Sequence, residues 1–149
     1  MVEHFIRNEK VPGSSPGRGS NTEHMKTEIK TNNAPGAIGP YSQGVKAGNF
    51  IYVSGQLPIN PLTGEMPEDV KGQTRQSLEN VKAILEEAGA TMQNVVKSTV
   101  YLAEMSYFGE MNEVYGEYFA GGIYPARAAF AVKELPKQAK VEIEVVAYV

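Results

Sequence analysis

The sequence predicts an α+β fold in which one mixed sheet carries two helices on a single face. Segments with the alternating or β-branched pattern of strands come before, between and after two amphipathic helical segments, in the order β, β, β, α, β, α, β, β. The 149 residues suffice for one domain with a single core. No third helical pattern is present to cover the second face of the sheet, so we expect oligomerisation to bury it.

The first 24 residues differ in composition from the rest of the chain. They are rich in Gly, Pro, Ser and Asn and lack a sustained apolar period. We interpret residues 1–24 as a disordered leader or an extension added for expression, and residues 25–149 as the folded domain, with Met25 as the natural start. A secretory signal needs an apolar stretch of about 7 to 15 residues, which is missing. We expect no membrane partner and a cytoplasmic protein.

Three short strands are expected in the first part of the domain. Residues 27–31 alternate between polar and apolar side chains. Residues 43–47 and 50–54 are apolar-leaning runs joined by Gly-Asn at 48–49, which predicts a hairpin. Residues 57–67 contain three prolines, which cannot donate ladder hydrogen bonds, so we expect a loop there.

The clearest helical pattern covers residues 69–88. Gly89 follows it, and glycine commonly ends a helix. Residues 95–102 are rich in β-branched side chains and predict a strand. The apolar stripe of the helix consists of Val70, Leu78, Val81, Ile84, Leu85 and Ala88.

A second helix is expected to begin at Ser106, which can cap it, and to continue to about Phe119, where Gly-Gly at 121–122 ends it. The last two predicted strands cover residues 127–135 and 140–149, and the turn residues between them predict a hairpin. The inner face of the second helix consists of Phe108, Met111, Tyr115, Tyr118 and Phe119.

The residues that the domain lacks limit its chemistry. The chain has no Cys, and its two histidines, His4 and His24, precede residue 25. A thiol nucleophile, a Ser-His-Asp triad and a histidine-rich metal site are therefore excluded, and we expect no metal. The formal charge of −3 argues against nucleic acid as an obligate partner, because no net basic field gathers phosphates.

Arg127 and two carboxylates are the strongest candidates for chemistry. Arg127 lies within YPARAAF, where alanines leave room around a guanidinium suited to bidentate capture of a carboxylate. The alternative is a rim arginine paired with a surface acid. Glu142 and Glu144 alternate with apolar residues in the last strand, so both are expected on the face away from the helices. Either is a candidate general base or part of a solvated strand face.

Three further segments are candidates to line a site. Tyr41 follows Pro40 among glycines that allow a ligand to approach closely, although a packed loop tyrosine is the alternative. Ser54 and Gly55 end a predicted strand, where backbone N–H groups face an anion or form a simple turn. Asn112 falls on the apolar side of the second helix, where a buried amide needs partners, so structural bonding is its alternative role.

Several motifs occur together in this chain. They are NAPGAIGPYSQG at 33–44, VSGQLPINP at 53–61, TRQSLENVKAILEEAG at 74–89, PARAAFAVKELPK at 125–137 and VEIE at 141–144. Across residues 25–149 the sequence resembles the RidA/YjgF family of reactive-intermediate deaminases.

The resemblance implies a chorismate-mutase-like α+β fold and a homotrimer whose three sheets enclose a central barrel, with sites in clefts between subunits. The family's carboxylate-binding Arg matches Arg127, its water-orienting Glu matches Glu142, and its cleft tyrosine matches Tyr41. The positions that line the cleft in similar proteins match Ser54, Gly55 and Asn112.

The activity that the resemblance implies is hydrolysis of 2-imino or enamine acids, such as 2-iminobutanoate and 2-iminopropanoate, to 2-keto acids and ammonia. An iminium carbon is already electrophilic, so no cofactor is expected. Glu144 is expected to be structural. Many members place a Cys where this chain has Ala129, which argues against thiol-based regulation. The alternatives are an endoribonuclease or translation inhibitor acting on single-stranded RNA, and a non-catalytic ligand-binding or chaperone-like module.

Overall fold

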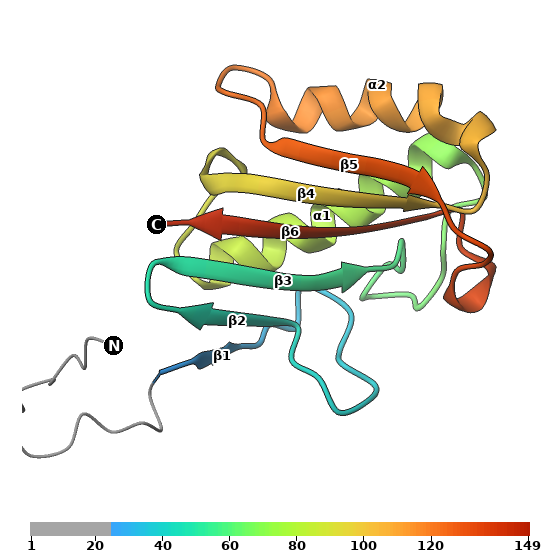
Figure 1. The fold of residues 1–149 in the computed structure, drawn as a ribbon. Helices are drawn as coiled ribbons and strands as arrows, with labels where there is room; N and C mark the ends of the chain where they lie inside the picture. Colours follow the sequence, from blue (N-terminus) through green and yellow to red (C-terminus); the bar gives the residue numbers. More distant parts are fainter. Residues whose placement is uncertain (1–24) are drawn as a thin grey trace, which may run out of the picture.

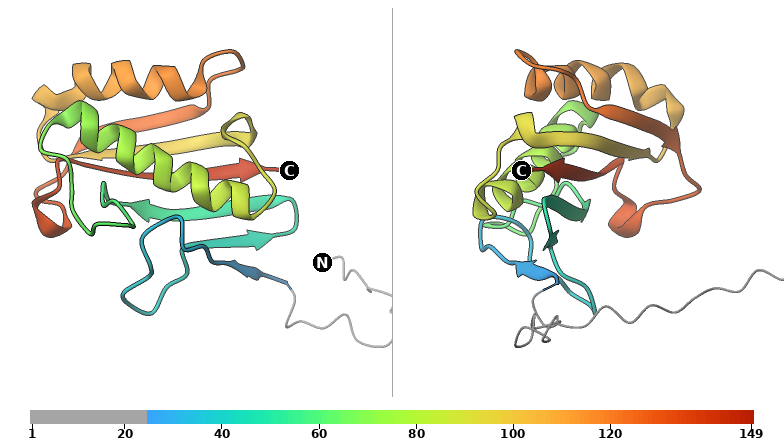
Figure 2. Two further views of the ribbon diagram at one scale, coloured as in Figure 1. Left: turned by 180° about the vertical axis from the view of Figure 1, so that it is seen from behind. Right: turned by 60° about the vertical axis from the view of Figure 1, so that its left-hand side comes forward.

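The computed structural model describes residues 25–149 and contains one six-stranded sheet with both helices on the same face (Figure 1, Figure 2). The strand order is β1-β2-β3-β6-β4-β5, and the predicted α+β class is confirmed. The expected leader, residues 1–24, lies outside the described residues. The strands are β1 (Thr27–Ile29), β2 (Gly44–Ala47), β3 (Phe50–Gln56), β4 (Val95–Leu102), β5 (Ala126–Ala131) and β6 (Val141–Tyr148), and the helices are α1 (Val70–Glu87) and α2 (Phe108–Phe119).

Helix α1 forms where the apolar stripe predicts it. Asp69 caps the helix, and its carboxylate accepts a hydrogen bond from the Gly72 N–H at 3.3 Å. Gly89 adopts a left-handed φ of 79° just beyond the last turn. The stripe packs on β6 and β3, so that Leu78 and Ile84 are fully buried and α1 covers the centre of the sheet (Figure 2).

Helix α2 begins later than predicted. A 3₁₀ turn, Met105–Tyr107, precedes it. The Ser106 hydroxyl donates to the Glu104 carboxylate at 3.1 Å instead of accepting from a helix N–H, so the predicted cap is wrong. The backbone is already turned at this point, which takes Ser106 out of the extended conformation that a cap needs. Neither this helix nor any other within residues 25–149 is long and apolar enough to cross a membrane.

The last two strands do not form the predicted hairpin. β6 lies between β3 and β4 and is antiparallel to both, whereas β5 lies at the sheet edge, parallel to β4. α2 therefore serves as the crossover that parallel neighbours require. β6 takes the centre because its alternate residues are large, apolar and buried, while the alanine-rich β5 buries less and stops at Ala131.

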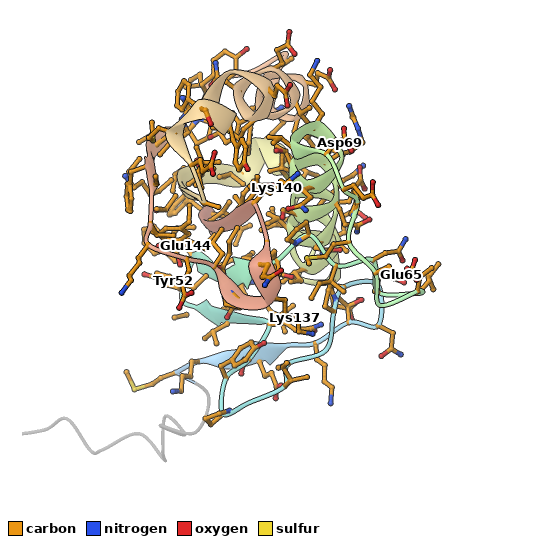
Figure 3. The ribbon with its side chains drawn as sticks, turned by 90° about the vertical axis from the view of Figure 1, so that its right-hand side faces the viewer. Tyr52, Glu65, Asp69, Lys137, Lys140 and Glu144 are labelled. Carbon is orange, nitrogen blue, oxygen red and sulfur yellow. The ribbon has the colours of Figure 1, made fainter. Side chains whose placement is uncertain are left out.

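The sheet face opposite the helices is open in the single chain. Glu142 and Glu144 lie on it, as the alternation predicted, because the residues between and beside them are buried on the helix side. Figure 3 shows Glu144 and Tyr52 together on this side of the sheet. Four aromatic side chains of this face are each 41 to 49% exposed. They are Phe50, Tyr52, Phe130 and Tyr148.

Candidate active site

Arg127 is held in place by two aromatic rings and an amide. It pairs with the fully buried Ser98 of β4, so its side chain projects toward α2. The guanidinium carbon lies 4.7 Å from the centroid of the Tyr115 ring and 5.4 Å from that of Phe108, which are cation–π distances. Nη1 donates a hydrogen bond to Asn112 Oδ1 at 2.7 Å. These contacts fix the plane of the guanidinium.

A hollow of about 400 Å³ adjoins the guanidinium, and Tyr124 and Pro125 form part of its wall. Asn112 is exposed at its edge, so the expectation of a buried amide is wrong, although the amide does bond to a partner. Arg127 belongs to neither of the two ion pairs formed within residues 25–149. Its remaining N–H donors are therefore available to a carboxylate that enters the hollow.

Glu142 lies on the open face, where it pairs with Tyr101 of β4 and is partly buried. Its carboxylate rests against the backbone of Gly55, where a Cβ would overlap Oε1. Burial raises the pKa of Glu142 above its ordinary value, and the negative charge of Glu144 raises this pKa further. A carboxyl group with a raised pKa is suited to accept and return a proton.

Glu144, the second carboxylate of this face, has a partner of its own. The Tyr101 hydroxyl donates a hydrogen bond to Glu144 Oε1 at 2.7 Å. This hydrogen bond, together with burial, raises the pKa of Tyr101 to about 12. The phenol therefore remains a donor at neutral pH and holds Glu144 in place beside Glu142.

The loop that carries Tyr41 is fastened to the sheet by a buried amide. Gln43 Oε1 accepts from the Thr31 N–H at 2.8 Å, and Nε2 donates to the Thr31 carbonyl at 3.0 Å. The Ser54 hydroxyl donates to the Ser42 carbonyl at 2.6 Å, which joins the same loop to β3. Tyr41 itself is 52% exposed and is not the packed loop tyrosine considered above.

A bulge in β3 explains how Gly55 meets Glu142. The strand continues to Gln56 rather than ending at Ser54, and its register with β6 shifts between Val53 and Gln56. Gly55 also lines a cavity of about 260 Å³ together with Tyr41. The bulge therefore places one backbone position between the carboxylate and this cavity.

The predicted site residues form two separate groups within one chain. One group consists of Arg127 and Asn112, and the other of Tyr41, Ser54, Gly55 and Glu142. Arg127 and Val145 both pair with Ser98 of β4, so they lie opposite each other two strands apart. Glu142 precedes Val145 by three residues in β6. Strand spacing puts the two residues about 14 Å apart, and they project from opposite faces of the sheet. One chain alone cannot place both on one small substrate.

Sequence reasoning missed two residues of this region. Tyr101 alternates along β4 with the core residues Val100 and Leu102, so its place on the open face beside Glu142 was open to prediction. Gln43 orders the loop that carries Tyr41, although residues 43–47 were predicted as a strand, and β2 begins only at Gly44. A residue pattern does not identify the backbone groups that a glutamine amide binds.

The fold and these residues define a class of protein: a small α+β domain with an arginine beside an open hollow on one side of its sheet and a partly buried carboxylate on the other. Residues 25–149 hold no group of three or more His, Cys, Asp or Glu placed to bind a metal ion. The chain belongs to the family described as Endoribonuclease L-PSP, whose sequence model matches residues 31–149. Its relatives carry RidA and YjgF names, so the resemblance stated from the sequence is confirmed.

Relatives and solved structures agree on this membership. A RutC family protein of Pyrococcus horikoshii is 58% identical over 125 residues, which are 83% of this chain and 98% of that protein. The 2-iminobutanoate/2-iminopropanoate deaminase of Escherichia coli is 50% identical over 125 residues, again 83% of this chain and 98% of the relative. The crystal structure of the E. coli YjgF gene product has a TM-score of 0.80 at 49% identity, covering 82% of this chain and 98% of that one. E. coli TdcF, solved with bound serine, has a TM-score of 0.80 at 46% identity, covering 83% and 98%.

Proposed function

We propose that this protein hydrolyses 2-imino acids and their enamine tautomers to 2-keto acids and ammonia, with 2-iminobutanoate and 2-iminopropanoate as substrates. The observation that carries the proposal is the Arg127 guanidinium, fixed by Asn112 at 2.7 Å beside an open hollow. The relative at 50% identity whose name states this activity supports the same assignment.

The proposed active form is a homotrimer whose sheets enclose a central barrel, with each site between two subunits. Two features of the single chain support this assembly. The open face exposes four aromatic side chains that association would bury. Arg127 and Glu142 lie on opposite faces of one sheet, so a second copy is needed to bring the Glu142 carboxylate to the side of Arg127.

In this mechanism Arg127 binds the substrate carboxylate through paired charge-assisted hydrogen bonds, each worth about 1.5 to 3 kcal/mol. Glu142 of the neighbouring copy orients a water and takes its proton as the oxygen attacks C2. The resulting carbinolamine loses ammonia and leaves the 2-keto acid. Tyr41, Ser54 and the backbone at Gly55 complete the cleft.

The reaction requires a positioned substrate, a positioned water and one general base. The carbon of a protonated imine is electrophilic, so water adds to it without prior activation of the substrate. The raised pKa of Glu142 suits a group that accepts a proton from water and returns it to the leaving nitrogen. We therefore propose that the reaction proceeds without a cofactor.

The test uses 2-aminoacrylate generated in place by a pyridoxal-phosphate lyase, with semicarbazide present to trap the imine that remains. The protein should raise the initial rate at which pyruvate and ammonia appear and lower the initial rate of semicarbazone formation, because the imine reacts with semicarbazide faster than pyruvate does. An unchanged initial rate of semicarbazone formation at micromolar protein would overturn the proposal. Cleavage of single-stranded RNA by the same preparation, which the family's description suggests as a second candidate activity, is measured in parallel.

A further inference from the structure

The cavity that Tyr41 and Gly55 line has three walls, and each wall is held by a buried amide. Gln43 holds the first loop through the Pro35 carbonyl at 2.8 Å. Asn80 of α1 donates to the carbonyls of Leu57 and Ile59, at 3.0 and 2.9 Å. Both amides are at most 3% exposed. The first two walls are thus set by the core and do not depend on a ligand.

The third wall is the turn before β6, which a third buried amide anchors. Gln73 Oε1 accepts from the Lys140 N–H at 2.8 Å, while its Nε2 donates to the Pro67 carbonyl at 2.8 Å. Ala139, the residue before this anchor, is 1% exposed. The turn is therefore fixed to α1 and to the end of the loop at residues 57–67.

Lys137 lies at the tip of this turn and lines the cavity. Its backbone is left-handed, with φ 55° and ψ 25°, and that of Gln138 follows with φ 58°. Residues other than glycine adopt this backbone region only at a cost in conformational free energy, and such residues are often found at functional sites. Figure 3 shows Lys137 on the turn at this end of the sheet, between Glu144 on the open side and Glu65.

The charge of the cavity points to the kind of ligand. Among the residues of 25–149 that line the cavity, Lys137 alone has a charged side chain. Its ammonium group takes part in neither of the two ion pairs formed within residues 25–149. Much of the remaining wall is apolar, with Ile38, Leu57 and Ile59. An ammonium only donates hydrogen bonds, so the partner must be an acceptor, and a carboxylate is the strongest one.

We propose that this cavity receives the side chain of the substrate and that Lys137 favours 2-imino acids whose side chain ends in a carboxylate. This inference rests on the proposed function, in which Glu142 activates the water. Gly55 lines the cavity and also contacts the Glu142 carboxylate, so the cavity adjoins the proposed reaction site. The imine of glutamate is the simplest such substrate: water adds to C2, the C–N bond breaks, and 2-oxoglutarate and ammonia leave.

The experiment compares kcat/KM for imines that an amino acid oxidase makes from glutamate, norleucine and alanine. Norleucine has a neutral side chain of similar length, and alanine does not reach the cavity. We expect the wild type to prefer the glutamate imine over the norleucine imine by about fivefold, the size of an exposed charge pair. This preference should weaken as salt is raised. Lys137→Asn should abolish it, since Asn removes the charge yet tolerates the left-handed backbone, whereas Lys137→Arg should keep it.

Lys133→Gln is the matched control, because Lys133 is exposed on the same connection and does not line the cavity. Calorimetry with 2-oxoglutarate and 2-oxohexanoate gives a second readout that needs no turnover, and Lys137→Asn should weaken the first ligand alone. Hydrolysis of the alanine imine without any charge preference would reject the role of Lys137 and leave the proposed function standing. Absence of all imine hydrolysis by the wild type would instead reject the proposed function. Equal binding of 2-oxoglutarate and 2-oxohexanoate by the wild type would reject the selectivity of the cavity.

Discussion

The carboxylate of Glu142 lies so close to the backbone of Gly55 that a Cβ at position 55 would overlap Oε1. This contact ties the bulge in β3 to the carboxylate of β6 and gives glycine a specific reason to be there. Its conformational freedom is not the reason, because Gly55 is not among the glycines with positive φ. The position of the carboxylate therefore depends on the absence of one methyl group.

The first prediction concerns Gly55→Ala. The new methyl group should displace the Glu142 carboxylate, and a misplacement of about 1 Å lowers turnover by about 100-fold. Imine hydrolysis and thermal unfolding are measured together. Gly109→Ala is the control, because a Cβ there meets nothing within 4 Å.

The double variant Gly55→Ala/Glu142→Ala separates folding from function. The overlap between the methyl group and the Glu142 carboxylate should lower the thermal stability of Gly55→Ala. Removing the carboxylate makes room for the methyl group, so the double variant should recover this stability without recovering activity. Full activity in Gly55→Ala alone would contradict the importance of this contact.

The second prediction concerns Arg127, whose guanidinium lies at a surface hollow rather than in the core. Arg127→Ala should abolish imine hydrolysis with the fold and assembly intact. Arg127→Lys keeps the charge but loses the planar fork and the paired contact to substrate, so kcat/KM should fall about ten- to a hundredfold. Arg75→Ala, which removes an exposed arginine paired with Glu117, should leave kinetics unchanged. Turnover near that of the wild type in Arg127→Ala would remove this residue from the mechanism.

The sequence predicted well those features that depend on one segment alone. The apolar stripe and Gly89 placed α1 to within a residue at each end, and the strand at residues 95–102 has the predicted bounds. The alternation of β6 correctly put Glu142 on the open face. Each of these follows from local periodicity, which a single sequence contains.

Features that depend on pairing between segments were not predictable in the same way. A turn before an apolar strand is compatible with a hairpin and equally with a last strand that inserts into the middle of the sheet. The position of β6 between β3 and β4 was therefore not predicted. The face of Arg127 depends on the register of β5 against β4, which residue patterns do not contain. The separation of Arg127 from Glu142 therefore emerged only from the structure.

The third prediction is that the protein sediments as a stable trimer at micromolar concentration. Phe130→Asp should shift it toward smaller species, because it places a charge on the open face that association would bury. Leu62→Asp, on a loop and 91% exposed, should not. A stable wild-type monomer would contradict the assembly.

The same assembly predicts rescue between two inactive chains. If each site takes Arg127 from one copy and Glu142 from another, a trimer that contains both Arg127→Ala and Glu142→Gln chains has one complete site out of three, and should therefore regain about one third of wild-type activity. The mixed trimers are obtained by co-expression with two different tags. Absence of any rescue in purified mixed trimers would place both residues of a site in one chain.

The fourth prediction distinguishes Glu142 as the base. Glu142→Gln preserves the size of the side chain and one hydrogen-bonding arm while removing proton acceptance. Turnover of 2-iminopropanoate should fall by about 100- to 10,000-fold, while pyruvate, the product, should still bind in a calorimeter. A larger loss in Glu144→Gln than in Glu142→Gln would reject this assignment, as would wild-type turnover in both.

The last prediction concerns how Glu144 sets the pH at which Glu142 works. Burial raises the pKa of Glu142 first, and the negative charge of Glu144 adds to that. A base must be ionised, so a raised pKa moves the acid limb of the kcat/KM profile to higher pH than an ordinary carboxylate would give. Glu144→Gln removes the charge and should move this limb to lower pH, with the rate on the plateau nearly unchanged. Tyr101→Phe keeps the charge and removes only its hydrogen-bond donor, so it should move the limb far less. An acid limb in Glu144→Gln that stays in place, or that moves to higher pH, would show that Glu144 does not act on Glu142 through its charge.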